Sequence, residues 1–138
     1  MTQTARPRPG AMRYADALSY RLPLAGWVSI LHRVSGLLIF ILLPFIIWMF
    51  DNSLTSEISF GVFKSAFAAG IGVIPAWLVK VVVLGLIWAY LHHFIAGLRH
   101  LWMDATHAVS KEFGRQSAVA TLSLSILLTL VLGYRLFF

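Results

Sequence analysis

Three apolar runs, each long enough to cross a lipid bilayer, dominate this chain. They extend over residues 24–50, 75–103 and 118–138, and each contains the roughly 20 residues that a membrane-spanning helix needs. Backbone polar groups inside a bilayer must be hydrogen-bonded within the protein, so such runs fold as helices. The sequence therefore predicts an all-α fold, an integral membrane bundle of three transmembrane helices within residues 24–138. Residues 1–23 form a polar tail before it.

The composition agrees with a membrane protein and excludes several kinds of site. Hydrophobic residues make up 59% of the 138 residues and charged residues only 12%, whereas about a quarter of a soluble domain is charged. The net charge of +6 comes from basic residues near the ends of the apolar runs, which predicts contact with membrane lipid and no binding of nucleic acid. Without cysteine, disulfides, iron–sulfur clusters and c-type haem are excluded. Any redox centre must be held by histidine.

Two prolines predict where helices in the apolar runs bend or begin. Pro44 falls late in the first run and predicts a kink near Phe40, because a proline inside a helix clashes with the carbonyl group four residues before it. Pro75 suits the first turn of the second helix, where its missing N–H costs nothing. The mixed segment 51–74 is expected to be a loop with a short surface helix over residues 60–69.

The distribution of basic residues predicts the orientation in the membrane. Segments with more lysine and arginine remain on the cytoplasmic side. With three helices, the amino-terminal tail and the loop between the second and third helices lie on the same side of the bilayer. These two segments carry most of the basic residues, so they are expected to be cytoplasmic. The first apolar run begins late and is not followed by a small-residue cleavage site, so it is not expected to be a cleaved signal peptide. The amino-terminal tail should therefore remain in the mature protein. The richer side has Arg6, Arg8, Arg13, Arg21, Arg99, Lys111 and Arg115, and the other side has Lys64, Lys80 and Arg135.

Two adjacent histidines, His92 and His93, lie in the middle of the second run. An ionisable side chain at this depth costs free energy and by default marks a functional site. The leading hypothesis is that one of them binds haem iron. The alternative for either residue is a hydrogen bond to a neighbouring helix, and for His92 this structural role is favoured.

Further polar residues are predicted at one depth on the first two helices. Ser29, His32 and Arg33 lie where the first helix enters the membrane, and His100 and Asp104 lie where the second helix leaves it. In a helix, residues at spacings of four, seven and eleven share a face. Such faces contain Ser29, Arg33 and Gly36 on the first helix, and His93, Gly97, His100 and Asp104 on the second.

The spacing favours a haem b over a bound metal ion. His93 lies about 10 Å deeper than His100, given the rise of two helical turns, so one ion cannot bind both. Zinc chelation from one helix needs ligands four residues apart, and only His100 and Asp104 satisfy that spacing. A haem needs one imidazole on each face of a flat ring, and Gly97 would leave room beside His93. Its propionates would be neutralised by His32, Arg33 and His100.

The residues also match the motifs of a known family. The segments Ser29-Ile-Leu-His-Arg-Val-Ser-Gly36 and His93-Phe-Ile-Ala-Gly-Leu-Arg-His100, followed by Asp104, closely resemble the cytochrome b membrane-anchor subunit of succinate dehydrogenase, respiratory complex II. The resemblance covers all three helices in order. It implies that Ser29 and Arg33 line the ubiquinone site and that His93 is the axial ligand of haem b, with the other ligand from a second membrane-anchor subunit.

The resemblance also implies a place for the chain. It would lie in the bacterial inner membrane as the electron-transfer subunit of a tricarboxylic acid cycle enzyme. Electrons would come from a soluble partner, because this chain lacks cysteine and a Gly-rich turn for flavin. The partners would be an iron–sulfur subunit and a flavoprotein subunit. The chain is not expected to be catalytic alone.

Several alternatives remain open from the sequence. A haem-free structural anchor and a small transporter or channel subunit would both carry buried histidine and arginine. A further alternative is that His32 and His93 together supply both axial ligands. Arg99 is expected to extend toward lipid phosphates, and His107 to be solvated. A polar ridge on the third helix is expected to pack against another helix rather than to form a substrate path. It comprises Thr121, Ser125 and Thr129.

Overall fold

The computed structural model describes residues 21–137, which form five helices and no strand. The helices are α2 (Leu24–Ile41), α3 (Leu43–Leu54), α4 (Glu57–Ala68), α5 (Ala76–Thr106) and α6 (Lys111–Phe137). Among these residues, α2, α5 and α6 are long and apolar enough to cross a membrane. The predicted all-α bundle with three transmembrane helices is therefore confirmed. Of the predicted tail, residues 1–20 with Arg6, Arg8 and Arg13 lie outside the described part of the chain.

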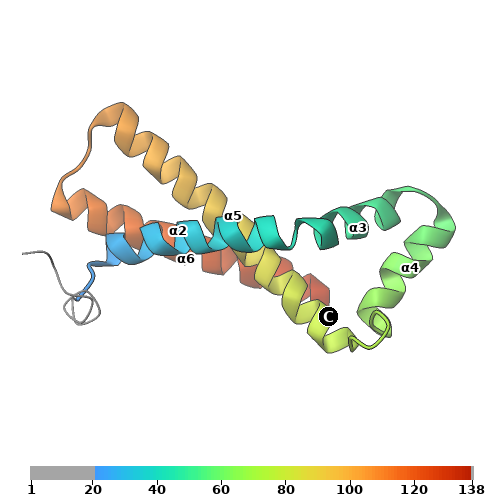
Figure 1. Cartoon of the computed structure of the whole chain (residues 1–138). Coiled ribbons are helices and arrows are strands. Elements are labelled where there is room, and N and C mark those ends of the chain that lie inside the picture. The colour runs from blue at the N-terminus through green and yellow to red at the C-terminus, as the bar shows by residue number, and fades with distance from the viewer. Residues whose placement is uncertain (1–20, 138) are drawn as a thin grey trace, which may run out of the picture.

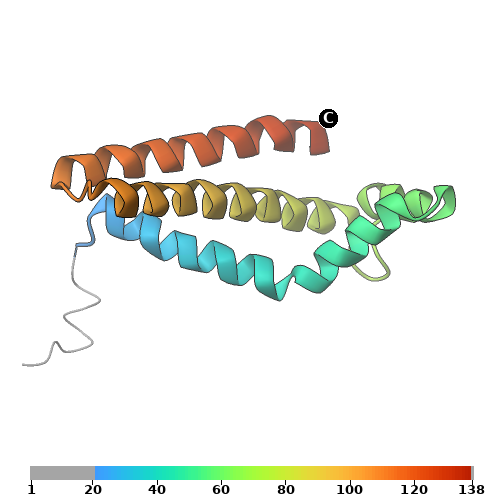
Figure 2. The same cartoon turned by 90° about the horizontal axis from the view of Figure 1, so that it is seen from above.

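Helix α5 is the centre of the bundle. It packs against both α2 and α6, and Figure 2 shows it between them. Their shared core contains Val28 of α2, Ala96 of α5 and Ala118 of α6, all fully buried. Small residues at this contact allow the helices to approach closely, as is common where lipid supplies no hydrophobic driving force between helices. The outer faces are exposed and apolar, as lipid contact requires.

The first predicted helix, residues 24–50, is two helices in the structure. Helix α2 ends at Ile41, α3 begins at Leu43, and Leu42 between them has a non-helical conformation. Pro44 takes the first turn of α3, where no N–H is needed and its ring no longer clashes with the carbonyl group of Phe40. The proline thus interrupts the helix instead of only kinking it. Figure 1 shows that α3 leads away from the bundle toward α4.

The other helices differ from their predicted bounds at their ends. Helix α5 begins directly after Pro75, and extends to Thr106 rather than residue 103. Helix α6 begins at Lys111 rather than residue 118, because the Ser110 hydroxyl accepts a hydrogen bond from the Phe113 amide and caps a polar first turn. The surface helix expected over 60–69 is α4, which begins earlier because Ser56 and Ser59 form a capping box.

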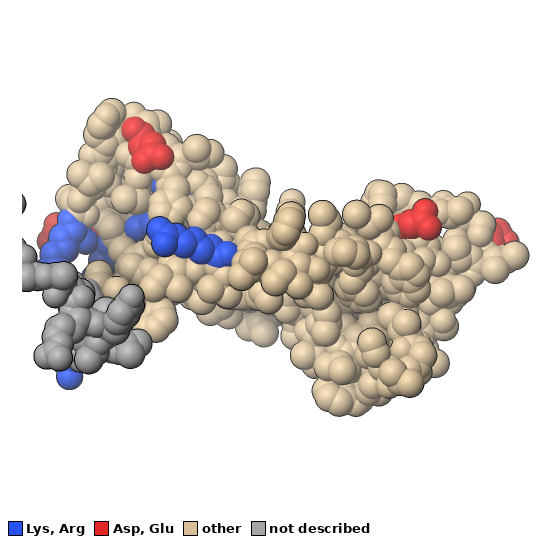
Figure 3. Space-filling model, viewed as in Figure 1, with Lys and Arg blue, Asp and Glu red and all other residues tan. Residues whose placement is uncertain are grey.

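Charged side chains are concentrated at the ends of the molecule. Figure 3 shows lysine and arginine together at the end where α2 begins and α5 turns into α6, while the long middle part of this face is uncharged. We call this the basic end. An uncharged middle band between polar ends is the pattern expected of a protein that crosses a bilayer.

Candidate functional site

Three imidazole rings meet where α2 crosses α5. The rings of His32 and His93 are stacked, with centroids 4.2 Å apart and planes 15° from parallel. The ring of His100 lies 5.2 Å from that of His32 and is tilted by 48°. The polar clusters that the sequence predicts at one depth on the first two helices are therefore brought together. His32 is the residue whose ring contacts both His93 and His100 of α5.

The hydrogen bonds of His93 decide which of its ring nitrogens is free. Its Nδ1 lies 2.9 Å from the backbone carbonyl oxygen of His32, which can only accept, so Nδ1 carries the proton and donates. The Ser35 hydroxyl donates to the same carbonyl oxygen at 2.9 Å and lies 3.5 Å from Nδ1. The Nε2 atom of His93 has no hydrogen-bond partner among residues 21–137, and it is not among the enclosed atoms. An imidazole with this arrangement is prepared to bind a metal through Nε2.

Two glycines make this close contact of α2 and α5 possible. A Cβ atom on Gly36 would lie 2.8 Å from Cε1 and 3.0 Å from Nδ1 of His93, closer than side chains tolerate. A Cβ atom on Gly97 would lie 3.6 Å from Nε2 of His32, which is an ordinary contact. The sequence predicts that Gly97 leaves room for a haem beside His93. In this structure, the His32 ring lies next to Gly97.

His92 faces a different neighbour from His93, because consecutive side chains on a helix are separated by about 100°. It is fully buried, its Nδ1 lies 3.3 Å from the Ser125 hydroxyl of α6, and its ring is stacked on Trp88. The Ser125 hydroxyl donates to the Leu122 carbonyl, so it accepts the proton of Nδ1. Nε2 is enclosed without a partner. No porphyrin can reach it while α5 and α6 are packed together.

The ridge of hydroxyl residues on α6 packs against its neighbours. Thr121, Ser125 and Thr129 are all buried, and each donates to a carbonyl group of its own helix. The prediction that this ridge is a packing surface is confirmed.

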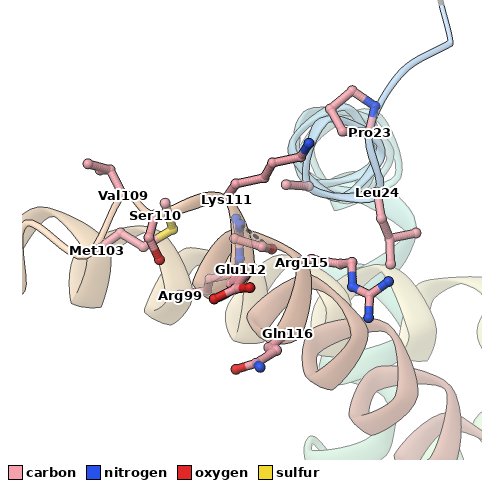
Figure 4. Close-up of a pocket in the computed structure, with 12 residues that line it drawn as sticks. Pro23, Leu24, Arg99, Met103, Val109, Ser110, Lys111, Glu112, Arg115 and Gln116 are labelled. Carbon is pink, nitrogen blue, oxygen red and sulfur yellow. Dashed lines mark hydrogen bonds between the residues drawn. The ribbon is translucent and has the colours of Figure 1, made fainter.

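Arg99 is buried between α5 and α6 and does not extend toward lipid phosphates. Its Nε donates to the Ser117 hydroxyl at 2.9 Å and an amino group donates to the Gly114 carbonyl at 3.3 Å. The expectation of a lipid-directed side chain was wrong because the polar first turn of α6, which begins at Lys111, supplies these acceptors. A cavity of about 770 Å³ adjoins Arg99 at the basic end (Figure 4), with Lys111 and Arg115 also in its wall.

Ser29 and Arg33 lie beside the surface of α2 that faces the bundle. That surface contains Val28, His32 and Ser35, whereas Ser29 is half-buried and Arg33 is exposed. Neither Ser29 nor Arg33 lines the cavity beside Arg99 or a second, smaller cavity between α5 and α6. Arg33 is therefore accessible to a molecule that approaches α2 from outside this chain.

The remaining polar residues of the predicted site lie near the basic end. His100 is half-buried, and Asp104 and His107 are exposed. His107 ends α5 in the left-handed conformation, with φ of 55°, and the expected exposure of its ring is confirmed. Within residues 21–137, no three histidine, aspartate or glutamate side chains converge on one point as a metal ion would need.

The fold and the site together define a multi-pass membrane subunit with a histidine cluster at the contact of two transmembrane helices. The family model described as succinate dehydrogenase/fumarate reductase transmembrane subunit matches residues 6–132. The chain therefore belongs to this family, as a cytochrome b membrane-anchor subunit of succinate dehydrogenase. The predicted resemblance is confirmed, and the alternative of a transporter or channel subunit is set aside.

Individual relatives agree with this assignment. The chain is 34% identical over 112 residues to the succinate dehydrogenase cytochrome b556 subunit of Paracoccus denitrificans, a match that covers 81% of each chain. It is 28% identical over 118 residues to the subunit of the same name from Coxiella burnetii (strain RSA 493 / Nine Mile phase I), covering 86% of this chain and 90% of the relative. Membership of this family means that the chain works in a complex with other succinate dehydrogenase subunits.

Proposed function

We propose that this subunit binds haem b through Nε2 of His93 and forms part of the ubiquinone reduction site with Ser29 and Arg33. The observation that carries the proposal is the state of the His93 ring. Its Nδ1 proton is held by the His32 carbonyl group while Nε2 is free. Metal-binding histidines almost always have such a second hydrogen bond, which fixes the tautomer and the ring orientation. The name cytochrome b556 of both relatives also supports a b-type haem.

The same geometry favours His93 over the other histidines. His92 is enclosed. His32 and His93 together do not suit one iron, because axial imidazoles stand on opposite faces of the porphyrin, whereas these rings are stacked 4.2 Å apart. The second axial ligand would therefore come from another chain, the second membrane-anchor subunit. His32, which contacts His100, and the exposed Arg33 next to it are with His100 the groups available to hold the propionates.

The quinone part of the proposal depends on the chemistry of Ser29 and Arg33. Reduction places negative charge on the quinone carbonyl oxygens, and hydrogen-bond donors fixed at those oxygens lower the barrier. Ser29 has a hydroxyl that can donate or relay a proton, and the Arg33 guanidinium supplies a fixed positive charge with several donors. Arg33 is exposed and Ser29 is half-buried beside the packed surface of α2, so partner subunits would complete the pocket. A flavoprotein subunit would pass electrons to an iron–sulfur subunit, which would deliver them to the quinone.

The experiment that tests haem binding is a difference spectrum of the purified complex. When bound, a b-type haem supplies one-electron chemistry and a sharp absorption band in the reduced state. We expect that band in the reduced-minus-oxidised spectrum, at one haem per copy of this chain. A purified, succinate-oxidising complex without the band would instead identify the chain as a haem-free anchor.

We also propose that the basic end lies in the cytoplasm of a bacterial cell, with the chain in the inner membrane. Lys111, Arg115 and Arg21 are exposed there, and basic residues favour the cytoplasmic side. Alkaline phosphatase folds only outside the cytoplasm, so its fusion after Phe138 should be active and its fusion after His107 inactive. The reverse pattern would show that the orientation is wrong.

A further inference from the structure

One turn of α2 holds the His93 ring from two directions. The backbone carbonyl of His32 accepts its Nδ1 proton, and the fully buried Ser35 hydroxyl lies beside the same bond. Gly36 presents bare backbone to the ring, at a position where a Cβ atom would lie 2.8 Å from Cε1. We call His32, Ser35 and Gly36 the α2 socket. The bond restrains Nδ1 of the ring, and Gly36 leaves the room that the ring needs beside α2.

We propose that the α2 socket sets the orientation and electron donation of the His93 imidazole, with Gly36 and Ser35 as positioning residues. This inference rests on the proposed role of His93 as haem ligand. The plane of an axial imidazole affects the electronic structure of the iron, and a hydrogen bond at Nδ1 raises the basicity of Nε2. A displaced ring or an altered Nδ1 bond therefore changes the spectroscopic signature and the midpoint potential of the haem, without contact between the socket and the iron.

Gly36→Ala tests the steric part of the socket. Either the His93 ring must rotate or α2 must move, because real Cβ atoms essentially never lie under 3.0 Å from a neighbour. Gly26→Ala is the matched control on the same helix, since its Cβ atom would meet only the Leu22 and Pro23 side chains at 3.5 Å or more. Both substitutions replace glycine with a better helix former on the same helix, so Gly26→Ala shows whether a gain in helix propensity alone alters the haem.

The measurements are made on the purified complex of this chain with its partner subunits. For Gly36→Ala we expect shifted g values of the oxidised haem in electron paramagnetic resonance and a shifted midpoint potential, or loss of haem from an assembled complex. Gly26→Ala should match the wild type. Wild-type g values, potential and haem content in Gly36→Ala would overturn the inference.

Ser35→Ala tests the hydrogen-bond part and does not add bulk, so it decides the question even if Gly36→Ala prevents assembly. The His32 carbonyl loses a second donor, and the Nδ1 proton of His93 loses the Ser35 hydroxyl oxygen, 3.5 Å away, as a second acceptor. Both losses act on the electron donation of Nε2, so the midpoint potential should shift from the wild-type value. An unchanged potential would contradict this part of the proposal. If the wild-type complex contained no haem, the proposed function itself would fail, which is a different result from an unaltered haem in the variants.

Discussion

A complex with His93→Leu is expected to lose its haem, while the neighbouring His92→Leu keeps it. Loss of a partner that only orients a metal ligand costs about 10- to 100-fold in affinity, and loss of the ligand itself should cost more. The two residues are adjacent in the sequence, but Nε2 is free in His93 and enclosed in His92. Haem content per purified complex, measured from the reduced-minus-oxidised spectrum, distinguishes the two variants.

The His92 variant is an informative control because its own expected effect is small. Leucine fills a volume similar to that of histidine and removes the buried Nε2, which has no hydrogen-bond partner. It also removes the hydrogen bond between Nδ1 and the Ser125 hydroxyl. Such an exchange changes stability by about 1 kcal/mol in either direction, which leaves the complex assembled. Haem loss in His92→Leu together with haem retention in His93→Leu would refute the assignment of the ligand.

The second large effect is expected for Arg33→Ala. If Arg33 stabilises charge that develops on the quinone oxygen, its removal should lower the turnover of ubiquinone reduction by about 100- to 1000-fold, as for other preorganised donors of this kind. Succinate oxidation with a soluble artificial acceptor should not change, because that reaction bypasses the quinone site. The measurement is the ratio of these two activities in one preparation.

Arg115→Ala provides the matched control for this experiment. Arg115 is also exposed at the basic end, but it lies on α6 beside the cavity near Arg99. It should retain the wild-type activity ratio, and haem content measured in parallel separates a quinone effect from haem loss. Wild-type ubiquinone reduction in Arg33→Ala would show that Arg33 has no part in the reaction.

The sequence predicts the number of membrane helices well because bilayer thickness imposes a minimum length on each apolar run. Helix ends are less predictable, since hydrophobicity marks depth in the membrane and not hydrogen bonding. Helix α6 begins at Lys111, in a polar turn capped by Ser110. The interruption at Leu42 was expected only as a kink, because the sequence does not say whether a proline will bend a helix or begin a new one.

The candidate site was predictable in its composition but not in its contacts. The sequence placed His32 and His100 at one depth and His93 about two turns deeper, and the structure shows that the His32 ring lies against both of the others. Spacing on one helix does not specify which side faces which neighbour, so the burial of Arg99 and the free Nε2 of His93 required the structure. The close approach at Gly36 had a sequence signal, a glycine seven residues after Ser29, but its partner was not identifiable before the helices were packed.

The different bonding partners of His92 and His93 have a consequence for comparing relatives of this subunit. Position 92 interacts with position 125 on α6, whereas position 93 interacts with α2. Substitutions at 92 should therefore covary with those at 125 during evolution and leave its sequence neighbour unaffected. We therefore expect these two consecutive residues to be constrained separately, one by its packing against α6 and the other by its hydrogen bond with α2.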